Sequence, residues 1–226
     1  MRHALSALLL LSAFAAHAQM PPSAEDLAGY TGLHAAAAKG DPVAIAVALV
    51  TGSNPNARDL AGRTPLHVAV FAGQPAAVRA LLAGRADPNA LERQRYDAIT
   101  IAAVQNDVDM LKLLLERGGN PRAVTSPYEG TALIAAAHLG HAEVVRTLIA
   151  AKAPLDHVNN LGWTALLEAV ILGDGGANHT EIVRALAAAG ANVNLADRQG
   201  ATPLAHARRR GFAEMVRILE GAGGRG

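Results

Sequence analysis

The chain has 226 residues, a formal net charge of +1 at neutral pH, no cysteine, and only three Phe, three Tyr and one Trp. The lack of cysteine excludes disulfides and thiolate metal sites. The balanced charge argues against nucleic acid or an anionic membrane as the main partner, because both select strongly basic surfaces.

The first 18 residues have the pattern of a secretory signal. Residues 1–3 are a short positive start, residues 5–14 are almost wholly apolar, and Ala16-His17-Ala18 is a small-x-small cleavage pattern. We therefore expect residues 1–18 to be a cleavable signal peptide and the protein to be periplasmic or secreted. The apolar run is shorter than the roughly 20 residues that span a bilayer, so no membrane insertion is expected after cleavage.

A six-residue pattern recurs along the rest of the chain, most clearly as Thr64-Pro65-Leu66-His67-Val68-Ala69. Its copies begin at residues 31, 64, 97, 131, 164 and 202, with spacings of 33, 33, 34, 33 and 38. A fixed period of this size predicts a stacked solenoid rather than a globule around one core. We expect residues 19–30 to form an N-terminal segment, residues 31–221 a domain of about six repeats, and residues 222–226 a flexible Gly-rich tail.

Each repeat is expected to fold as a helix, a tight turn, a second helix and an extended loop, which makes the domain all-α. In the second repeat, Thr64 can cap a helix whose first position is Pro65, and Gly73 ends that helix. Helices this short are marginal alone, so neighbouring repeats must stabilise them. Arg85 and Lys152 stand where other repeats have a glycine after the second helix, and a left-handed residue other than glycine costs about 1 kcal/mol there.

Two positions that are apolar in the first five repeats become charged in the sixth, at Arg208 and Glu220. Their counterparts are Ala37, Val70, Ala103, Ala137 and Val170 in the first helices, and Leu49, Leu82, Leu115, Ile149 and Ala187 in the second helices. A terminal repeat needs a polar outer face because no further repeat covers it. The sixth repeat is therefore predicted to be a polar C-terminal cap.

These patterns resemble the ankyrin repeat family. The run from Asp59 to His67 is close to the family consensus, and so is Gly190-Ala191-Asn192-Val193-Asn194. Residues 128–194 also resemble secreted bacterial ankyrin proteins, in which runs such as Asn-Asn-Leu-Gly-Trp-Thr-Ala-Leu are familiar. The resemblance covers residues 31–221. It implies helix-turn-helix repeats joined by extended β-turn loops, which bind other proteins through the loop tips and the exposed side of the first helices.

Carried over by position, the resemblance implies a protein-binding surface on the loop tips and in the groove beside them. The predicted residues are Leu60, Arg63, Phe71, Arg93, Gln94, Tyr96, Tyr128, His138, Leu139, Leu161, Trp163, Ile171 and Leu172. Tyr, Trp and Arg dominate binding hot spots, so Trp163 and Tyr128 are expected to anchor the partner. The alternative, in which a tip aromatic only packs on the adjacent loop, stays open.

No catalytic or metal-binding pattern is found. His34 and His67 occupy a slot in which the resemblance implies hydrogen bonds to neighbouring loop backbone. His138 and His141 are separated by Gly140, which breaks a helix, so they do not form the same-face pair of a zinc helix. The serines lie in no Gly-x-Ser-x-Gly elbow, and no glycine-rich phosphate cradle follows a strand. We expect no metal, no cofactor and no enzymatic activity.

The fifth repeat is longer than the others, and the excess lies between Gly173 and Thr180. Residues 174–179 are expected to form a protruding turn, with Asn178 or Thr180 capping the next helix. Insertions in solenoids often lie on the binding face. A surface loop also lengthens at little entropic cost, so a functional and a neutral insertion both stay open.

The sequence favours a monomeric, non-catalytic interaction module whose partner is another protein. The leading hypothesis is a scaffold or accessory factor for a cell-envelope protein, with a link to stress defence suggested by the bacterial resemblance. The alternative is an inhibitor or immunity-type protein that occludes a partner enzyme with residues 174–179.

Overall fold

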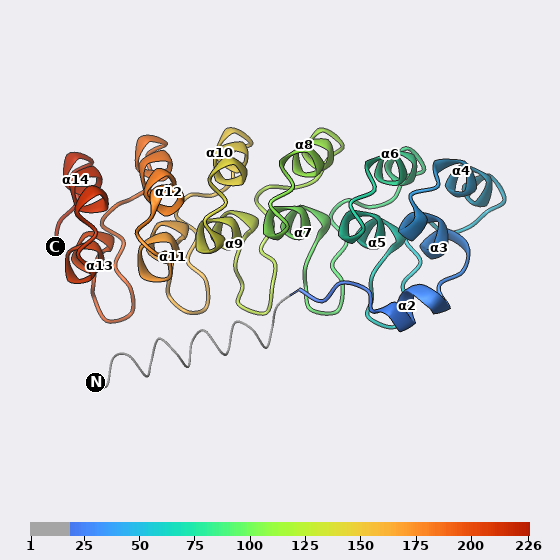
Figure 1. Cartoon of the computed structure of the whole chain (residues 1–226), viewed down its shortest axis with the longest axis horizontal. Coiled ribbons are helices and arrows are strands. Elements are labelled where there is room, and N and C mark those ends of the chain that lie inside the picture. The colour runs from blue at the N-terminus through green and yellow to red at the C-terminus, as the bar shows by residue number, and fades with distance from the viewer. Residues whose placement is uncertain (1–18) are drawn as a thin grey trace.

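The computed structural model describes residues 19–226. Over this range the chain is all-α, and its helices pair into units that stack along one axis (Figure 1). The first helices of the pairs form one row, the second helices form another, and long loops extend from the first row on the opposite side. The predicted all-α solenoid is confirmed. The predicted signal peptide lies outside the described residues.

Six helix pairs begin at the six copies of the sequence pattern. The first helices are α3 (Gly32–Lys39), α5 (Pro65–Phe71), α7 (Ala98–Val104), α9 (Ala132–Leu139), α11 (Ala165–Ile171) and α13 (Pro203–Arg210). The second helices are α4 (Pro42–Val50), α6 (Pro75–Ala83), α8 (Val108–Glu116), α10 (Ala142–Ala150), α12 (Ala177–Ala188) and α14 (Ala213–Gly221). In repeats two to six a Thr or Asp side chain caps the first helix by accepting a backbone hydrogen bond from the third helical residue.

The core runs without a break through all six pairs. Ala37, Val70, Ala103, Ala137 and Val170, the small positions late in the first helices, are fully buried. Their sixth-repeat counterpart Arg208 is exposed and pairs with exposed Glu220 at 2.7 Å. The predicted polar cap is thus present in the sixth repeat.

An additional helix, α2 (Ala24–Gly29), precedes the first pair and was not predicted. Ser23 and Asp26 form a reciprocal capping box at its start, each side chain accepting a hydrogen bond from the other's backbone N–H. The pattern Ser-x-x-Asp carries this information in the sequence. In Figure 1 the helix lies beside the loops of the first repeats.

The turns after the second helices share one left-handed residue. Arg85 and Lys152 adopt φ values of 64° and 65° at the positions where Gly52 and Gly118 have 92° and 94°. Their predicted left-handed conformation is confirmed. In the sixth repeat the equivalent residue is Gly223, while Gly221 lies inside α14.

The C-terminal tail is held against the last loop rather than free. The Thr202 hydroxyl donates to the Arg225 carbonyl at 2.6 Å, and the Arg225 N–H donates to the Asn194 side chain at 2.7 Å. These two contacts of Arg225 do not favour the flexible tail expected over residues 222–226, whose mobility stays a prediction. Among residues 19–226, no helix combines the length and the apolar character needed to cross a bilayer.

Candidate protein-binding surface

The loop tips are closed by one repeated set of hydrogen bonds. In the loop at the end of the first repeat the Asp59 carboxylate accepts from the N–H groups of Ala61 and Arg63 at 2.9 and 2.8 Å, while the Asp59 N–H donates to the Arg63 carbonyl. Asn159 forms the same turn with Leu161 and Trp163 in the loop at the end of the fourth repeat. The backbone of the residue just before the helix cap is therefore held inside the loop by these hydrogen bonds.

This geometry corrects the predicted binding surface at three residues. Arg63, Tyr96 and Trp163 occupy the position before the cap and are only 4%, 7% and 8% exposed. Their side chains are covered within the structure, so they cannot meet a partner as the loop pattern suggested. The burial of Trp163 does not favour the predicted anchor role, and the structural alternative, in which the ring packs against the neighbouring loop, fits it better.

The other predicted residues keep exposed surface. Leu60, Arg93 and Leu139 are exposed, and the partly exposed residues are Phe71, Gln94, Tyr128, His138, Leu161, Ile171 and Leu172. Tyr128 is held in its loop, because its carbonyl accepts a hydrogen bond from the Asn160 N–H at 2.9 Å. The apolar residues at the ends of α5, α9 and α11 therefore form the available surface of the first-helix row.

Arg63 joins α2 to the solenoid instead of facing a partner. Its guanidinium contacts the Asp26 carboxylate at 2.8 Å and the Asp59 carboxylate at 2.6 Å, and the Tyr30 hydroxyl donates to Asp59 at 2.6 Å. The hydrogen bond from Arg63 lowers the pKa of Asp26 to about 2. Burial alone would raise the pKa of Asp59, but the hydrogen bonds from Tyr30 and Arg63 outweigh it and lower this pKa.

His138, one of the predicted binding residues, is tied to a buried acid. Its Nδ1 lies 3.1 Å from the Glu168 carboxylate, and the Asn159 amide donates to the other Glu168 oxygen at 2.9 Å. Glu168 and Asn159 are buried, so the three residues form a polar connection between the fourth and fifth repeats. Such satisfied buried groups specify packing, and the arrangement indicates a structural role for the imidazole.

Two other buried titratable groups also belong to the scaffold. Burial lowers the pKa of His67 to about 4, and its ring contacts the Thr64 hydroxyl at 2.8 Å and the Tyr96 carbonyl at 3.3 Å. Burial raises the pKa of Asp97, which caps α7 through Thr100. One Asp97 oxygen has no hydrogen-bond partner among the described residues. Both groups are almost fully covered, so neither is offered to a ligand.

The insertion in the fifth repeat is docked rather than protruding. Helix α12 begins at Ala177 after Gly176, so Asn178 and Thr180 lie inside the helix and the predicted caps are wrong. The His179 ring lies 2.9 Å from the Asp174 carboxylate and 3.2 Å from the His138 carbonyl. At Gly175, with φ of 76°, a Cβ would lie 2.4 Å from the Phe212 ring. These contacts tie the segment 174–179 to the neighbouring repeats, while Asp174, Gly176, Ala177 and Asn178 stay exposed.

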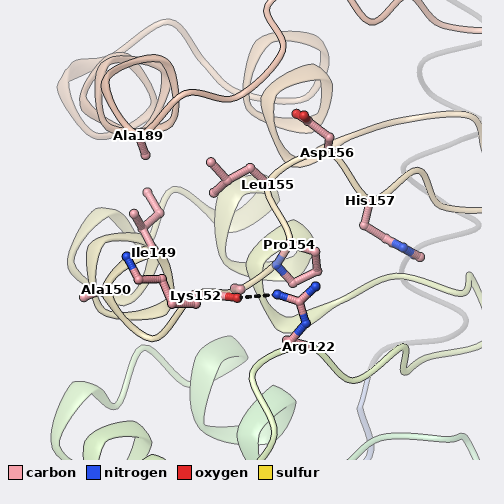
Figure 2. A pocket seen from close by; sticks show the side chains of 10 residues that line it. Arg122, Ile149, Ala150, Lys152, Pro154, Leu155, Asp156, His157 and Ala189 are labelled. Atoms are coloured by element: carbon pink, nitrogen blue, oxygen red, sulfur yellow. Dashed lines mark hydrogen bonds between the residues drawn. The ribbon is translucent and has the colours of Figure 1, made fainter.

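A shallow hollow of about 650 Å³ lies at the ends of α10 and α12 (Figure 2). Arg122, Lys152 and His157 line it, but Figure 2 shows their charged ends pointing in different directions. The Arg122 guanidinium is engaged with the Lys152 carbonyl at 3.1 Å. None of the predicted binding residues lines this hollow, and its polar groups do not converge as those of a catalytic site do.

Family comparison decides the class of the protein. Residues 4–92 and 99–197 match the profile described as ankyrin repeats (3 copies), and residues 176–220 match a second profile, ankyrin repeats (many copies). The chain belongs to the ankyrin repeat family. This ankyrin repeat protein therefore has a fold that generally serves protein–protein interaction and is typically non-catalytic.

Similar proteins come from bacteria and eukaryotes. An ankyrin repeat domain from Acinetobacter baumannii AYE is 46% identical, with a TM-score of 0.82, over 85% of this chain and 98% of that one. The human ASB11 ankyrin repeat domain is 25% identical, with a TM-score of 0.71, over 87% and 85% of the two chains. The ankyrin repeat protein YahD of Escherichia coli (strain K12) is 34% identical over 124 residues, which cover 54% of this chain and 61% of YahD. The chain thus spans less than two thirds of that curated relative.

Proposed function

We propose that this protein is a non-catalytic scaffold or accessory factor of the cell envelope, possessing one groove for a partner protein. The observation that carries the proposal is the row of solvent-accessible apolar residues at the ends of the first helices, namely Phe71, Leu139, Ile171 and Leu172. Large apolar side chains kept at a soluble surface in a row mark interaction sites. The envelope location rests on the signal pattern of residues 1–18, and a link to stress defence rests only on the bacterial resemblance.

Arginine residues at the C-terminal end of this row favour a partner segment that carries an acidic residue. Arg210 donates to the carbonyls of Val170 and Ile171 at 2.9 and 2.5 Å, and its guanidinium lies 4.5 Å from the Phe212 ring centroid. Arg209 beside it is exposed. A partner segment that combines apolar residues with an acidic one fits this surface, because the apolar groups bury area and the charges set orientation.

The test compares two charge-matched double variants in a cross-linking capture from the envelope fraction of the producing cell. Leu139→Glu/Leu172→Glu places two acids in the groove, while Ala150→Glu/Ala188→Glu places two acids on the exposed second helices α10 and α12. We expect the wild type and the second variant to capture the same envelope protein and the groove variant to lose it. Equal capture by all three chains would show that the groove is not the binding surface.

The location has a separate test, which does not depend on the partner. Cell fractionation followed by N-terminal sequencing is expected to recover a chain that starts at Gln19 in the envelope compartment. Recovery of an intact chain from the cytoplasm would contradict the envelope role and would leave the groove result standing.

A further inference from the structure

Helix α4 presents an apolar surface to solvent at the N-terminal end of the solenoid. Val43, Val47 and Val50 are 71%, 59% and 89% exposed. Their i, i+4 and i+7 spacing places them on one face of the helix. None of the nine residues from Pro42 to Val50 is charged. Three exposed valines in one stripe differ from isolated surface apolar residues, which need no explanation.

Each of the other second helices carries a charged residue at one or both of two positions where α4 is apolar. Counted from the helix ends, the counterparts of Val43 are Ala76, Asp109, Glu143, Glu181 and Glu214, and those of Ala46 are Arg79, Lys112, Arg146, Arg184 and Arg217. In repeats four to six these residues form a ladder of ion pairs, including Arg146 with Glu143 at 2.8 Å and with Glu181 at 2.9 Å. Charged residues are therefore usual at these solvent-facing positions of the second helices, and the first repeat lacks them.

The position of Val47 identifies what kind of surface α4 is. Its counterpart in the third repeat, Leu113, is only 6% exposed. The counterparts in the other repeats are also less exposed than Val47. The first repeat differs from the rest in having no preceding repeat among the described residues, which accounts for the exposure of Val47. The valine stripe is therefore continuous with a repeat-stacking face that is left open.

We propose that α4 is a self-association surface, through which two copies of this chain pack head to head. An uncharged stripe complements another uncharged stripe, and the chain has one such end. The opposite end exposes Arg208, Arg217 and Glu220, so stacking α4 on it would bury charges against valines at a large desolvation cost. The same patch on both copies gives a closed two-fold dimer rather than an open filament. This departs from the monomer expected from the sequence.

The first test measures the mass of the purified chain by sedimentation equilibrium over a concentration series. The variant Val43→Glu/Ala46→Arg copies the native Glu143 and Arg146 pair into α4. The control Ala76→Glu places the same kind of pair beside Arg79 in the second repeat. Wild type and control are expected to reach the dimer mass, and the α4 variant is expected to stay monomeric with an unchanged circular dichroism spectrum. All three chains start at Gln19, the N-terminus expected after signal cleavage, so a difference in mass reports on α4.

The second test uses the absence of cysteine in the chain. Val50→Cys is expected to form a covalent dimer under mild oxidation, whereas Ala188→Cys, at the equivalent exposed position of α12, is expected to remain monomeric. A wild type that is monomeric at every soluble concentration would overturn the proposal, as would equal cross-linking by both cysteine variants. A monomeric chain whose α4 selectively binds a different protein would assign the stripe to that protein and equally overturn self-association.

Discussion

The two ends of the solenoid are stabilised in different ways. At the N-terminal end one covered guanidinium, that of Arg63, joins Asp26 of α2 to Asp59 in the loop of the first repeat. At the C-terminal end the ion pairs are exposed and form a chain through Arg184, Glu214 and Arg217. Covered ion networks depend on every member, while exposed pairs contribute little individually. Stability is therefore concentrated in one residue at the first end and distributed over several at the second.

The ends also differ in what they offer to another molecule. The last repeat closes the core with Arg208 and Glu220, and Thr202 holds the chain terminus against it. The first repeat has no comparable charged pair on α4, whose valines face water. A solenoid requires polar outer faces at its ends for solubility. An end that lacks one is suited to contact, which is why the difference between the ends points to association at α4 alone.

The largest expected effect comes from breaking the N-terminal network. Arg63→Met keeps much of the side-chain volume but leaves the largely covered Asp59 carboxylate without its cation, and such removals cost about 3 kcal/mol. We expect that loss in the free energy of unfolding from urea titrations, with faster amide exchange in α2. Arg184→Ala at the other end should cost about 0.5 kcal/mol, because its pairs are exposed. Equal losses in the two variants would contradict the contrast between the ends.

Acid should weaken the N-terminal repeats before the C-terminal ones. The slot of His67 holds His34 in the first repeat but Ile134, Leu167 and Ala205 in the last three. Burial lowers the pKa of His67 from 6.5 to about 4, so the unfolded chain binds the proton first. Its contribution is fully present above pH 6.5 and is lost as pH falls toward 4, by roughly 3 kcal/mol in total.

Urea unfolding measured from pH 7.5 to pH 4 checks this expectation, with His67→Gln as the control. The variant should be less stable at pH 7.5 and should show a flatter dependence in the window between the two pKa values. The Asp26 carboxylate titrates lower, since its pKa is about 2, so it does not obscure that window. An unchanged slope in the variant would show that His67 is not the group responsible.

The fold could be predicted from the sequence because each repeat carries its own short-range signals. The Thr caps, the turn glycines and the 33-residue period are short-range features, and stacking then places them in register. The insertion was harder to predict. Gly176 rather than Asn178 occupies the N-cap position of α12, because the contact of His179 with the His138 carbonyl and the close approach of Gly175 to Phe212 hold the turn against neighbouring repeats. Such contacts between repeats are not encoded near the turn itself.

The site was predicted less well because loop residues were treated as uniformly exposed. Trp163 and Leu161 are two residues apart in one loop, yet the first is buried and the second is partly exposed. The difference arises from the turn that Asn159 closes on the Trp163 N–H. An Asp or Asn four residues before the buried position, as at Asp59 before Arg63 and Asn159 before Trp163, is the signal that could have separated the two.

The smallest expected effect on the free energy of unfolding concerns the turns after the second helices. It is the same in the N-terminal and the C-terminal half of the solenoid. Arg85→Gly and Lys152→Gly should each raise the free energy of unfolding, by up to about 1 kcal/mol, because glycine adopts φ near 65° without a Cβ clash. The hydrogen bond from Arg122 to Lys152 uses the backbone carbonyl, so the second change leaves it intact. Gly118→Ala is the reverse control and should destabilise by a similar amount. If either glycine variant unfolds at lower urea concentration than the wild type, the arginine or lysine side chain contributes a contact that outweighs the strain of its backbone.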